Sequence, residues 1–286
     1  MRFHRNVWSM ISVVAVGVSF PTVPSARAGL PDKNLEAAVR AVIFEKKDNN
    51  NEITDDDLKK VFILEGKGKG IKDLTGLEKC TNLQLLNLAK NEISDVSALK
   101  DIKNLQSLDL SQNKIADVTP LGNIVALQFL ELSDNQIESV QPLSTLTKLS
   151  ALYIAGNKIA DVAPLAKLER LSSLDLARNK ISDIKPLTNV GILSLLKLSG
   201  NEISDITPLS RPLSVRLLIM ENNKLTDLAP FVAAVKADAD GDKRFAPFLR
   251  FYLNGNPLSD TAKTAQFEAL KAAGVKIDFG DMKIEK

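Results

Sequence analysis

The sequence predicts a right-handed, curved α/β solenoid with a parallel sheet on its concave face and short 3₁₀ turns on its convex face. Three observations predict it. Asparagine recurs every 22 residues, leucine recurs at fixed places before each asparagine, and aspartate and proline recur at fixed places after it. We expect a helical cap before the repeats and a cap of helix and strand after them, because an uncapped solenoid would expose its core.

The asparagines define the repeat frame, L-x-x-L-x-L-x-x-N-x-I/L. It reads LQLLNLAKNEI from residue 83, LQSLDLSQNKI from residue 105 and LQFLELSDNQI from residue 127. The asparagines that keep this spacing are Asn91, Asn113, Asn135, Asn157, Asn179, Asn201 and Asn223. This is the leucine-rich repeat signature, in which each coil touches only its neighbours and stacked coils share one apolar core.

One copy shows why the spacing is fixed. A strand alternates its faces, so Leu108 and Leu110 point into the core and Asp109 between them points outward. A sharp turn follows and leaves backbone groups in a buried corner, where an asparagine amide can both donate and accept. We therefore interpret the asparagines as a structural ladder. The aspartate four residues later is expected to cap the next short turn, and the proline after it to begin that turn.

The chain opens with a basic start, an apolar run over residues 7–20 and the small residues around Ala26-Arg27-Ala28. This pattern predicts a signal peptide over residues 1–28, with an uncleaved amphipathic anchor as the alternative. The apolar run is short for a bilayer, and no second apolar stretch approaches membrane-spanning length. We expect an exported protein, periplasmic or secreted, with no membrane span after cleavage.

Cleavage of the signal peptide would remove residues that several kinds of catalytic, metal and nucleic-acid-binding site require. His4 is the only histidine, so the mature chain cannot build a Ser-His-Asp triad or a histidine-ligated metal site. Three arginines also leave, and the net charge falls from +2 to 2 − 3 = −1. Nucleic-acid binding, which needs a basic face, is not supported. Cys80 is predicted to be a buried, inert thiol. No catalytic residue, metal or cofactor is predicted, and a monomer is expected.

Residues 29–60 predict a helical N-terminal cap of two helices around an asparagine-rich loop. The apolar stripe of the first helix comprises Leu35, Ala38, Val39, Val42 and Ile43. The loop alternates Asp48, Asn50 and Glu52 in the manner of an EF-hand. Its sixth position is not glycine and its twelfth is Lys59, so the calcium frame is incomplete.

The repeats are assigned to residues 61–256, beginning with a degenerate coil that has Lys69 in the asparagine place. Near their end the spacing from Asn223 to Asn256 becomes 33 residues, so 11 extra residues fall near 231–247. We expect them to lengthen the convex side into a helix. The aspartates in this stretch are interpreted as a solvated turn rather than a metal site; they are Asp238, Asp240 and Asp242. Residues 257–286 predict a C-terminal cap.

The frame N-x-I-S-D-V/I-x-P-L resembles the repeats of bacterial internalins and of the leucine-rich regulator of type 1 protein phosphatase. The helical cap is similar to the truncated EF-hand-like cap of internalins, which does not bind calcium. This resemblance covers about residues 30 to 260 and implies a scaffold that binds proteins, often through its concave face. The chain lacks the immunoglobulin-like domain and sorting tail of internalins, so wall attachment is not expected. Its ending from Arg244 looks like those of exported repeat proteins of Gram-negative-type bacteria such as planctomycetes.

The outward strand positions vary between copies, so we expect them to carry partner specificity. The predicted partner-binding residues of the concave face are Leu85, Asn87, Asp109, Phe129, Glu131, Tyr153, Asp175, Leu195, Lys197, Leu217, Ile219 and Tyr252. Solvated apolar side chains on a rigid sheet indicate an interaction surface. Asp109, Glu131 and Asp175 form an acidic flank that favours a partner with some positive charge. The alternative is that all of these are ordinary strand formers.

The predicted function is that of an exported, non-catalytic module that binds a protein of unknown identity. A carbohydrate- or peptidoglycan-binding module is the alternative, because the frame places Tyr153 near Glu131 and Asp175. A hydrolase is less favoured. Carboxylates alone can catalyse glycoside hydrolysis, but here they lie on an open sheet without an enclosed cleft.

Overall fold

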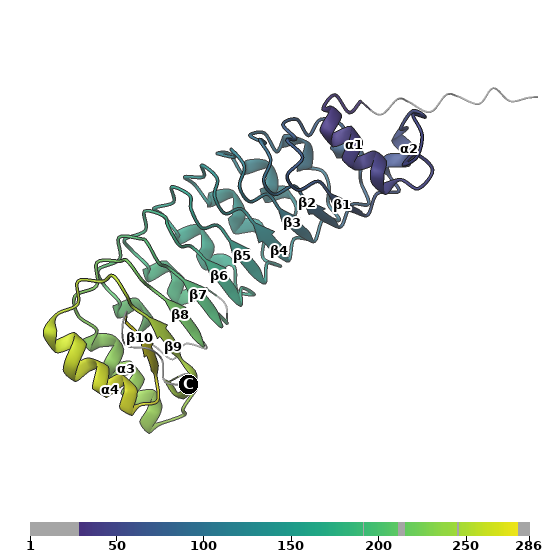
Figure 1. Ribbon diagram of the computed structural model, residues 1–286. Helices are drawn as coiled ribbons and strands as arrows, with labels where there is room; N and C mark the ends of the chain where they lie inside the picture. Colours follow the sequence, from purple (N-terminus) through teal and green to yellow (C-terminus); the bar gives the residue numbers. More distant parts are fainter. Residues whose placement is uncertain (1–28, 191, 211–214, 245, 280–286) are drawn as a thin grey trace, which may run out of the picture.

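The computed structural model of the protein describes residues 29–190, 192–210, 215–244 and 246–279 (Figure 1). The predicted signal peptide, residues 1–28, lies outside the described residues. Within the described ranges, ten strands form one sheet in which the order in space is the order in sequence, and every neighbouring pair is parallel. The predicted solenoid fold is confirmed.

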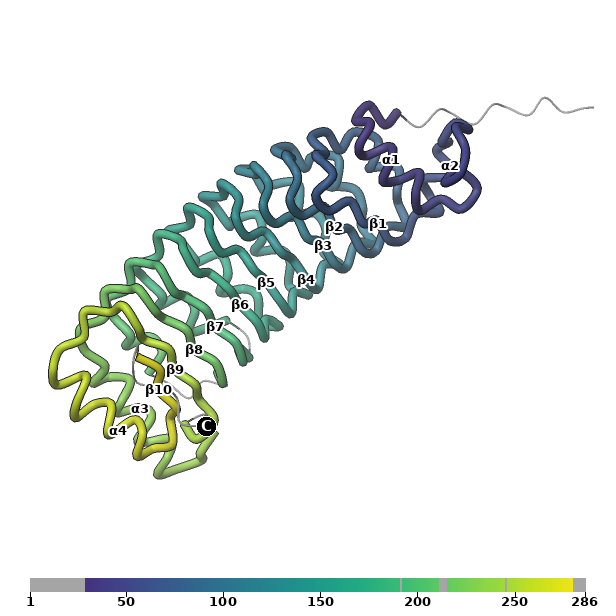
Figure 2. Tube along the Cα trace, in the orientation of Figure 1, coloured from purple at the N-terminus to yellow at the C-terminus, as the bar shows by residue number. Residues whose placement is uncertain are grey.

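Each coil contributes one strand of three residues to the sheet. The strands are β1 (Ile63–Glu65), β2 (Leu85–Asn87), β3 (Ser107–Asp109), β4 (Phe129–Glu131), β5 (Ala151–Tyr153), β6 (Ser173–Asp175), β7 (Leu195–Lys197), β8 (Leu217–Ile219), β9 (Arg250–Tyr252) and β10 (Lys276–Asp278). The path of the chain shows the coils stacked one behind another (Figure 2).

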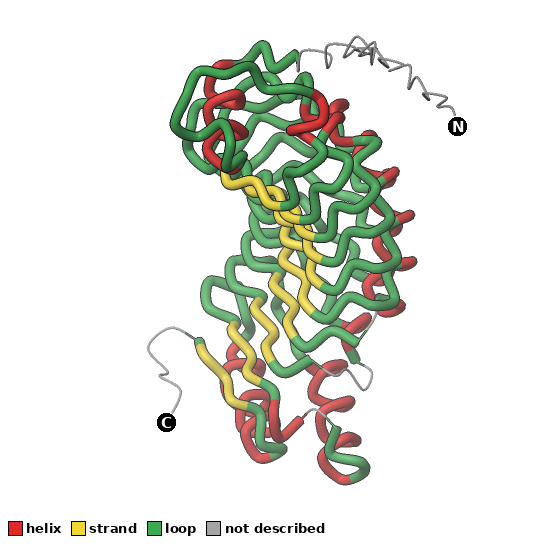
Figure 3. The backbone as a smooth tube through the Cα atoms, turned by 90° about the vertical axis from the view of Figure 1, so that its right-hand side faces the viewer, coloured by secondary structure: helices red, strands yellow, loops and turns green. Residues whose placement is uncertain are grey.

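The returning segments carry 3₁₀ turns, as the short connections predicted. These turns are Leu77–Lys79, Ser97–Leu99, Thr119–Asn123, Gln141–Thr145, Ala163–Lys167, Lys185–Asn189, Thr207–Leu209 and Ala246–Phe248. In the side view the strands line the concave side of the curved molecule and the turns line the convex side (Figure 3). Aspartates hold the turns. Asp117 Oδ1, for example, accepts from Thr119 N at 2.8 Å.

The core is one continuous cluster that runs through the stacked coils from the N-terminal cap to β10. In β4 only the middle residue, Leu130, is fully buried, because the strand alternates between the core and the concave face. Each fully buried leucine contributes roughly 1.5–3 kcal/mol by burial, so the repeated leucines are the main source of stability.

The asparagines stand in the buried corner after each strand. Asn135 Nδ2 donates to Leu110 O and Leu132 O, each at 3.0 Å, and its Oδ1 accepts from Ile115 N at 3.0 Å. One amide thus bonds the backbone of its own coil and of the preceding coil. The other predicted ladder asparagines make the same set of bonds, and Asn256 repeats it across the longer last coil.

The N-terminal cap consists of α1 (Lys33–Val42) and α2 (Asp55–Leu58). Asp32 fastens it to the first coil. Its Oδ1 accepts from Asn34 N and Leu35 N at the start of α1, and its Oδ2 accepts from Lys72 N and Asp73 N of the coil at 2.8 and 3.1 Å.

Two details of this cap concern the predictions. Val42, the last residue of α1, belongs to the predicted apolar stripe but is 44% exposed, whereas the other members of the stripe are buried. In the asparagine-rich loop, Arg40 Nη1 donates to Asn49 O and Asn51 O, and Lys46 Nζ donates to Glu52 O. The backbone carbonyl oxygens of the loop therefore accept hydrogen bonds from positively charged side chains of the cap itself.

The C-terminal end differs from the regular coils. The lengthened coil does contain a helix, α3 (Ala229–Asp240), which begins just before the predicted 231–247 stretch and ends within it. A π-helical turn (Ala262–Gln266) leads into α4 (Phe267–Ala272) before β10. The predicted solvated turn was wrong for Asp238, which is only 6% exposed. Its two carboxylate oxygens accept from Arg244 N and Ala246 N at 2.9 Å each, so it holds the loop after α3 in place.

Candidate functional site

Two rows of outward side chains form the concave face. We call first row the first residue of each strand: Ile63, Leu85, Ser107, Phe129, Ala151, Ser173, Leu195, Leu217, Arg250 and Lys276. We call second row the third residue of each strand: Glu65, Asn87, Asp109, Glu131, Tyr153, Asp175, Lys197, Ile219, Tyr252 and Asp278. The strand register places all the predicted partner-binding residues side by side in these two rows.

The side chains of the two rows are less accessible than predicted. The sequence suggested solvated positions, but from β2 to β8 both outward residues of every strand are half-buried. Neighbouring strands lie only about 4.8 Å apart, so each outward side chain is flanked by its equivalents in the adjoining coils. The side chains of this face therefore pack against one another. A partner would bury only the part of their apolar surface that is still exposed to water.

The second-row carboxylates also serve the fold. Asp109 Oδ1 accepts from Ser111 N at 2.9 Å and from Ser111 Oγ at 2.7 Å. Glu131 Oε1 accepts from Ser133 N at 2.8 Å. Each bond closes a turn at the end of its strand. This role was not predicted from the sequence, although an acceptor side chain two residues before a small residue, as in DLS and ELS, is a recognisable signal for such a turn.

An aromatic pair lies at the centre of the face. The rings of Phe129, in the first row of β4, and Tyr153, in the second row of β5, meet edge to face with centroids 5.6 Å apart. The register places Tyr153 between the carboxylates of Glu131 and Asp175. Aromatic anchors beside charged groups are common at the centres of protein interfaces.

Charge is distributed unevenly along the rows. Over β1–β6 they hold Glu65, Asp109, Glu131 and Asp175 and no lysine or arginine, which gives 0 − 4 = −4. Over β7–β10 they hold Lys197, Arg250, Lys276 and Asp278, which gives 3 − 1 = +2. Lys197 Nζ lies 3.1 Å from Asp175 Oδ2, so the two halves meet in an ion pair.

Glu131 is a half-buried carboxylate in the middle of the acidic half. Burial raises the pKa of its carboxyl group, the bonds from Ser133 oppose that rise, and the negative charges of Asp109 and Asp175 add to it. A cation placed beside this carboxylate would relieve both the repulsion and the lost hydration.

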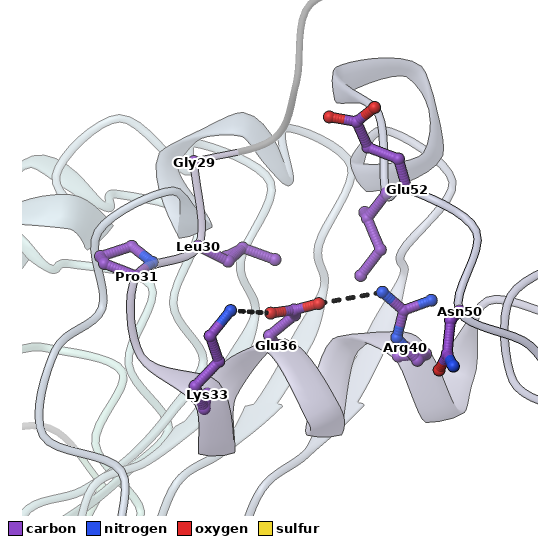
Figure 4. Close-up of a pocket in the computed structure, with 9 residues that line it drawn as sticks. Gly29, Leu30, Pro31, Lys33, Glu36, Arg40, Asn50 and Glu52 are labelled. Atoms are coloured by element: carbon purple, nitrogen blue, oxygen red, sulfur yellow. Dashed lines mark hydrogen bonds and ion pairs between the residues drawn. The ribbon is translucent and has the colours of Figure 1, made fainter.

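Other candidate sites offer fewer groups that could bind a ligand or a metal ion. An open cavity of about 510 Å³ lies at the N-terminal cap, between residues 29–31, α1 and the loop around Glu52 (Figure 4). Its central charge is already paired, since Glu36 accepts from Lys33 Nζ at 2.8 Å and from Arg40 Nη2 at 2.9 Å. Within the described residues, no group of three His, Cys, Asp or Glu side chains is arranged to hold a metal ion.

Cys80 is fully buried, as predicted. Burial, with a smaller contribution from Glu78, raises the pKa of its thiol to about 12. At neutral pH the sulfur is therefore protonated and shielded from solvent, which makes it a poor nucleophile.

Comparisons with known proteins agree with the geometry. The family model "Leucine Rich repeats (2 copies)" matches residues 81–123, 125–167 and 147–189. Among solved structures, internalin C2 from Listeria monocytogenes is 25% identical, with a TM-score of 0.60, and the match covers 87% of this chain and 93% of that one. Another Listeria monocytogenes internalin, InlF, is 24% identical over 86% of this chain and 88% of its own, with a TM-score of 0.49.

A structure outside this group shares the fold. The PEPR1–AtPEP1 complex matches with 21% identity and a TM-score of 0.55 over 73% of this chain and 30% of that one. No curated protein matches the sequence. Of the helices in the part of the chain that the structure describes, none has the length and apolar character needed to cross a bilayer.

Proposed function

Because the chain is an internalin-like leucine-rich repeat protein, we propose that it binds a protein partner through the concave face of its sheet. Leucine-rich repeats are in general protein-interaction modules. The observation that carries the proposal is the make-up of the two outward rows. They place the Phe129–Tyr153 pair and the leucines of β7 and β8 on one rigid face, beside charged groups of both signs. Such a mixture of anchors and charges suits a protein interface better than a surface that merely tolerates strand formers.

We infer that the protein is exported, periplasmic or secreted, and that it acts as a monomer without catalysis. The basic start, apolar run and small residues of segment 1–28 support export. The position of the concave carboxylates on an open sheet supports a non-catalytic role. Asp109 and Glu131 already accept hydrogen bonds from their own turns, and Asp175 is paired with Lys197.

A glycan-binding role would rest on Tyr153 between Glu131 and Asp175 alone. Neither the family model nor the structural neighbours adds support to it. A glycan array probed with the wild type and with Tyr153→Ala tests it directly, because a saccharide stacked on the ring would be lost with the ring.

The proposal is tested by affinity capture from the envelope fraction of the exporting cell, followed by titration of the purified partner. The Phe129→Ser/Leu217→Ser variant removes two apolar side chains of the first row and should lose the partner. The matched control is Phe44→Ser/Val125→Ser, which removes apolar side chains that are 78% and 50% exposed outside both rows. Circular dichroism should show that all three proteins are folded. Equal affinity of the first variant and the control would refute a concave site.

A further inference from the structure

We propose that the partner presents an arginine or lysine of an extended segment to the N-terminal half of the concave face. Asp109 and Glu131 would pair with the cationic head group, and the Phe129–Tyr153 pair would pack against its aliphatic stem. This inference rests on the proposed function and adds the chemistry of the partner and the place where it binds.

Charge complementarity favours a positively charged side chain on the concave face at β1–β6. The rows of β1–β6 carry four carboxylates and no lysine or arginine, whereas β7–β10 carry a net positive charge. A basic side chain is therefore drawn to the first half of the sheet and repelled from the second. The same field disfavours nucleic acid and anionic lipid at β1–β6, because both would bring phosphates to a negative surface.

Hydrogen bonding leaves Asp109 and Glu131 each with an oxygen for a donor from outside. The turns use one oxygen of each group, Oδ1 of Asp109 and Oε1 of Glu131. Asp175 differs, because its Oδ1 accepts from Ala177 N and its Oδ2 is paired with Lys197. Asp109 and Glu131 lie directly opposite each other on β3 and β4, so one guanidinium group could bridge their remaining oxygens.

The aromatic pair lies where the stem of that side chain would pass. Phe129 shares β4 with Glu131, and Tyr153 is the cross-strand partner of Glu131 on β5. An arginine held by the two carboxylates would place its methylene groups against these rings and its guanidinium within reach of a ring face. Burial and, to a smaller extent, the charges of Asp109 and Asp175 raise the pKa of the Glu131 carboxyl group, so a cation beside it would stabilise the ionised form.

Fluorescence anisotropy with short synthetic peptides tests the inference. The probe is a fluorescein-labelled glycine–serine peptide that contains two arginines, and the comparison probes replace both arginines with glutamine or with glutamate. The wild type should bind the arginine peptide most tightly, and added salt should weaken that binding. Asp109→Asn/Glu131→Gln keeps an oxygen for each turn and removes both charges. It should weaken binding of the arginine peptide about tenfold or more, as expected when close charge pairs are removed.

The control variant is Asp117→Asn/Glu138→Gln. It also removes two negative charges, but from residues that lie outside both rows. Its affinity should stay within about twofold of the wild type, because solvent and salt screen distant charges. Failure of the wild type to prefer arginine over glutamine, or equal weakening by both variants, would overturn the inference. The proposed function is judged separately. If Phe129→Ser/Leu217→Ser loses the captured partner and Asp109→Asn/Glu131→Gln keeps it, the concave face binds a protein but not through a basic side chain.

Discussion

Replacing Asn135 with alanine should destabilise the solenoid while leaving the concave face intact. The change removes the acceptor of Ile115 N–H, a buried donor whose bond to Asn135 Oδ1 is 3.0 Å long. It also removes one donor each from Leu110 O and Leu132 O. These carbonyls keep a second bond, from Asn113 Nδ2 at 2.9 Å and from Asn157 Nδ2 at 3.1 Å.

The magnitude follows from this count of bonds. An orphaned buried donor costs about 1–3 kcal/mol, and each carbonyl that loses one of two bonds costs about 0.5 kcal/mol. The free energy of unfolding should therefore fall by about 2–4 kcal/mol. Urea denaturation followed by circular dichroism measures the change. Asn123→Ala, at an exposed convex position, is the matched control and should cost less than about 0.5 kcal/mol.

A second substitution at the same place separates hydrogen bonding from volume. Asn135→Asp keeps an acceptor for Ile115 N–H but turns a carboxylate oxygen toward two carbonyl oxygens. Burial should raise the folded-state pKa of this carboxyl group above its unfolded value. The penalty is then largest at pH 7 and shrinks as pH falls through the folded pKa, since the protonated group is neutral and can donate. A loss below about 0.5 kcal/mol for Asn135→Ala, or a penalty for Asn135→Asp that grows in acid, would refute the reasoning.

Three further predictions concern the cap, the turns and the thiol. Burial would raise the pKa of Asp32, but backbone donors from α1 and the first coil outweigh it and hold that pKa below its usual value. Asp32→Ala should therefore lower the free energy of unfolding by about 1–2 kcal/mol at pH 7. In urea titrations this difference from the wild type should vanish as pH falls through the folded pKa. Gly156 has a φ of +65°, and an added Cβ would collide with the carboxylate of Asp134. Gly156→Ala should therefore lower the free energy of unfolding by about 1–3 kcal/mol, with no comparable loss for Thr147→Ala at an exposed position. Cys80 should resist iodoacetamide at pH 8 in the folded protein and react in urea; fast labelling without urea would show that the thiol is not shielded.

The repeat period was enough to predict the sheet and its register. Coils of equal length place equivalent residues side by side, so a spacing of 22 residues pairs Leu86 with Leu108 and Leu130 with Leu152. It also placed the asparagine amide in the corner, where one side chain can satisfy backbone groups of two coils. These predictions succeeded because each feature is repeated, and the repetition distinguishes what the coil requires from what is particular to one copy.

Features that occur once were predicted less well. Asp238 looked like part of a solvated turn because D-x-D-x-D carries no sign of burial. The structure buries it because the longer α3 brings its C-terminal end against the loop that holds Arg244 and Ala246. Val42 fits the apolar period of its helix but is 44% exposed, while Ile43, just beyond the helix, is buried. In both cases the outcome depends on tertiary contacts that no second copy of the sequence reveals.

The second row separates what the fold needs from what it leaves open. Asn87 Oδ1 accepts from Ala89 N at 3.1 Å, so a neutral amide closes the same turn that Asp109 closes at 2.9 Å. At Tyr153 the second row supplies no acceptor for the turn, and Ser133 Oγ of the preceding coil accepts from Ala155 N at 3.1 Å instead. The fold thus requires neither charge at Asp109 nor charge at Glu131, and it places the two carboxylates side by side, where they repel each other. Asp109→Asn/Glu131→Gln should therefore be as stable as the wild type or more stable in urea, while it binds the arginine peptide less tightly. Charges that lower stability and raise affinity are the pattern expected of a binding site, and a marked loss of stability in this variant would assign the carboxylates to the scaffold instead.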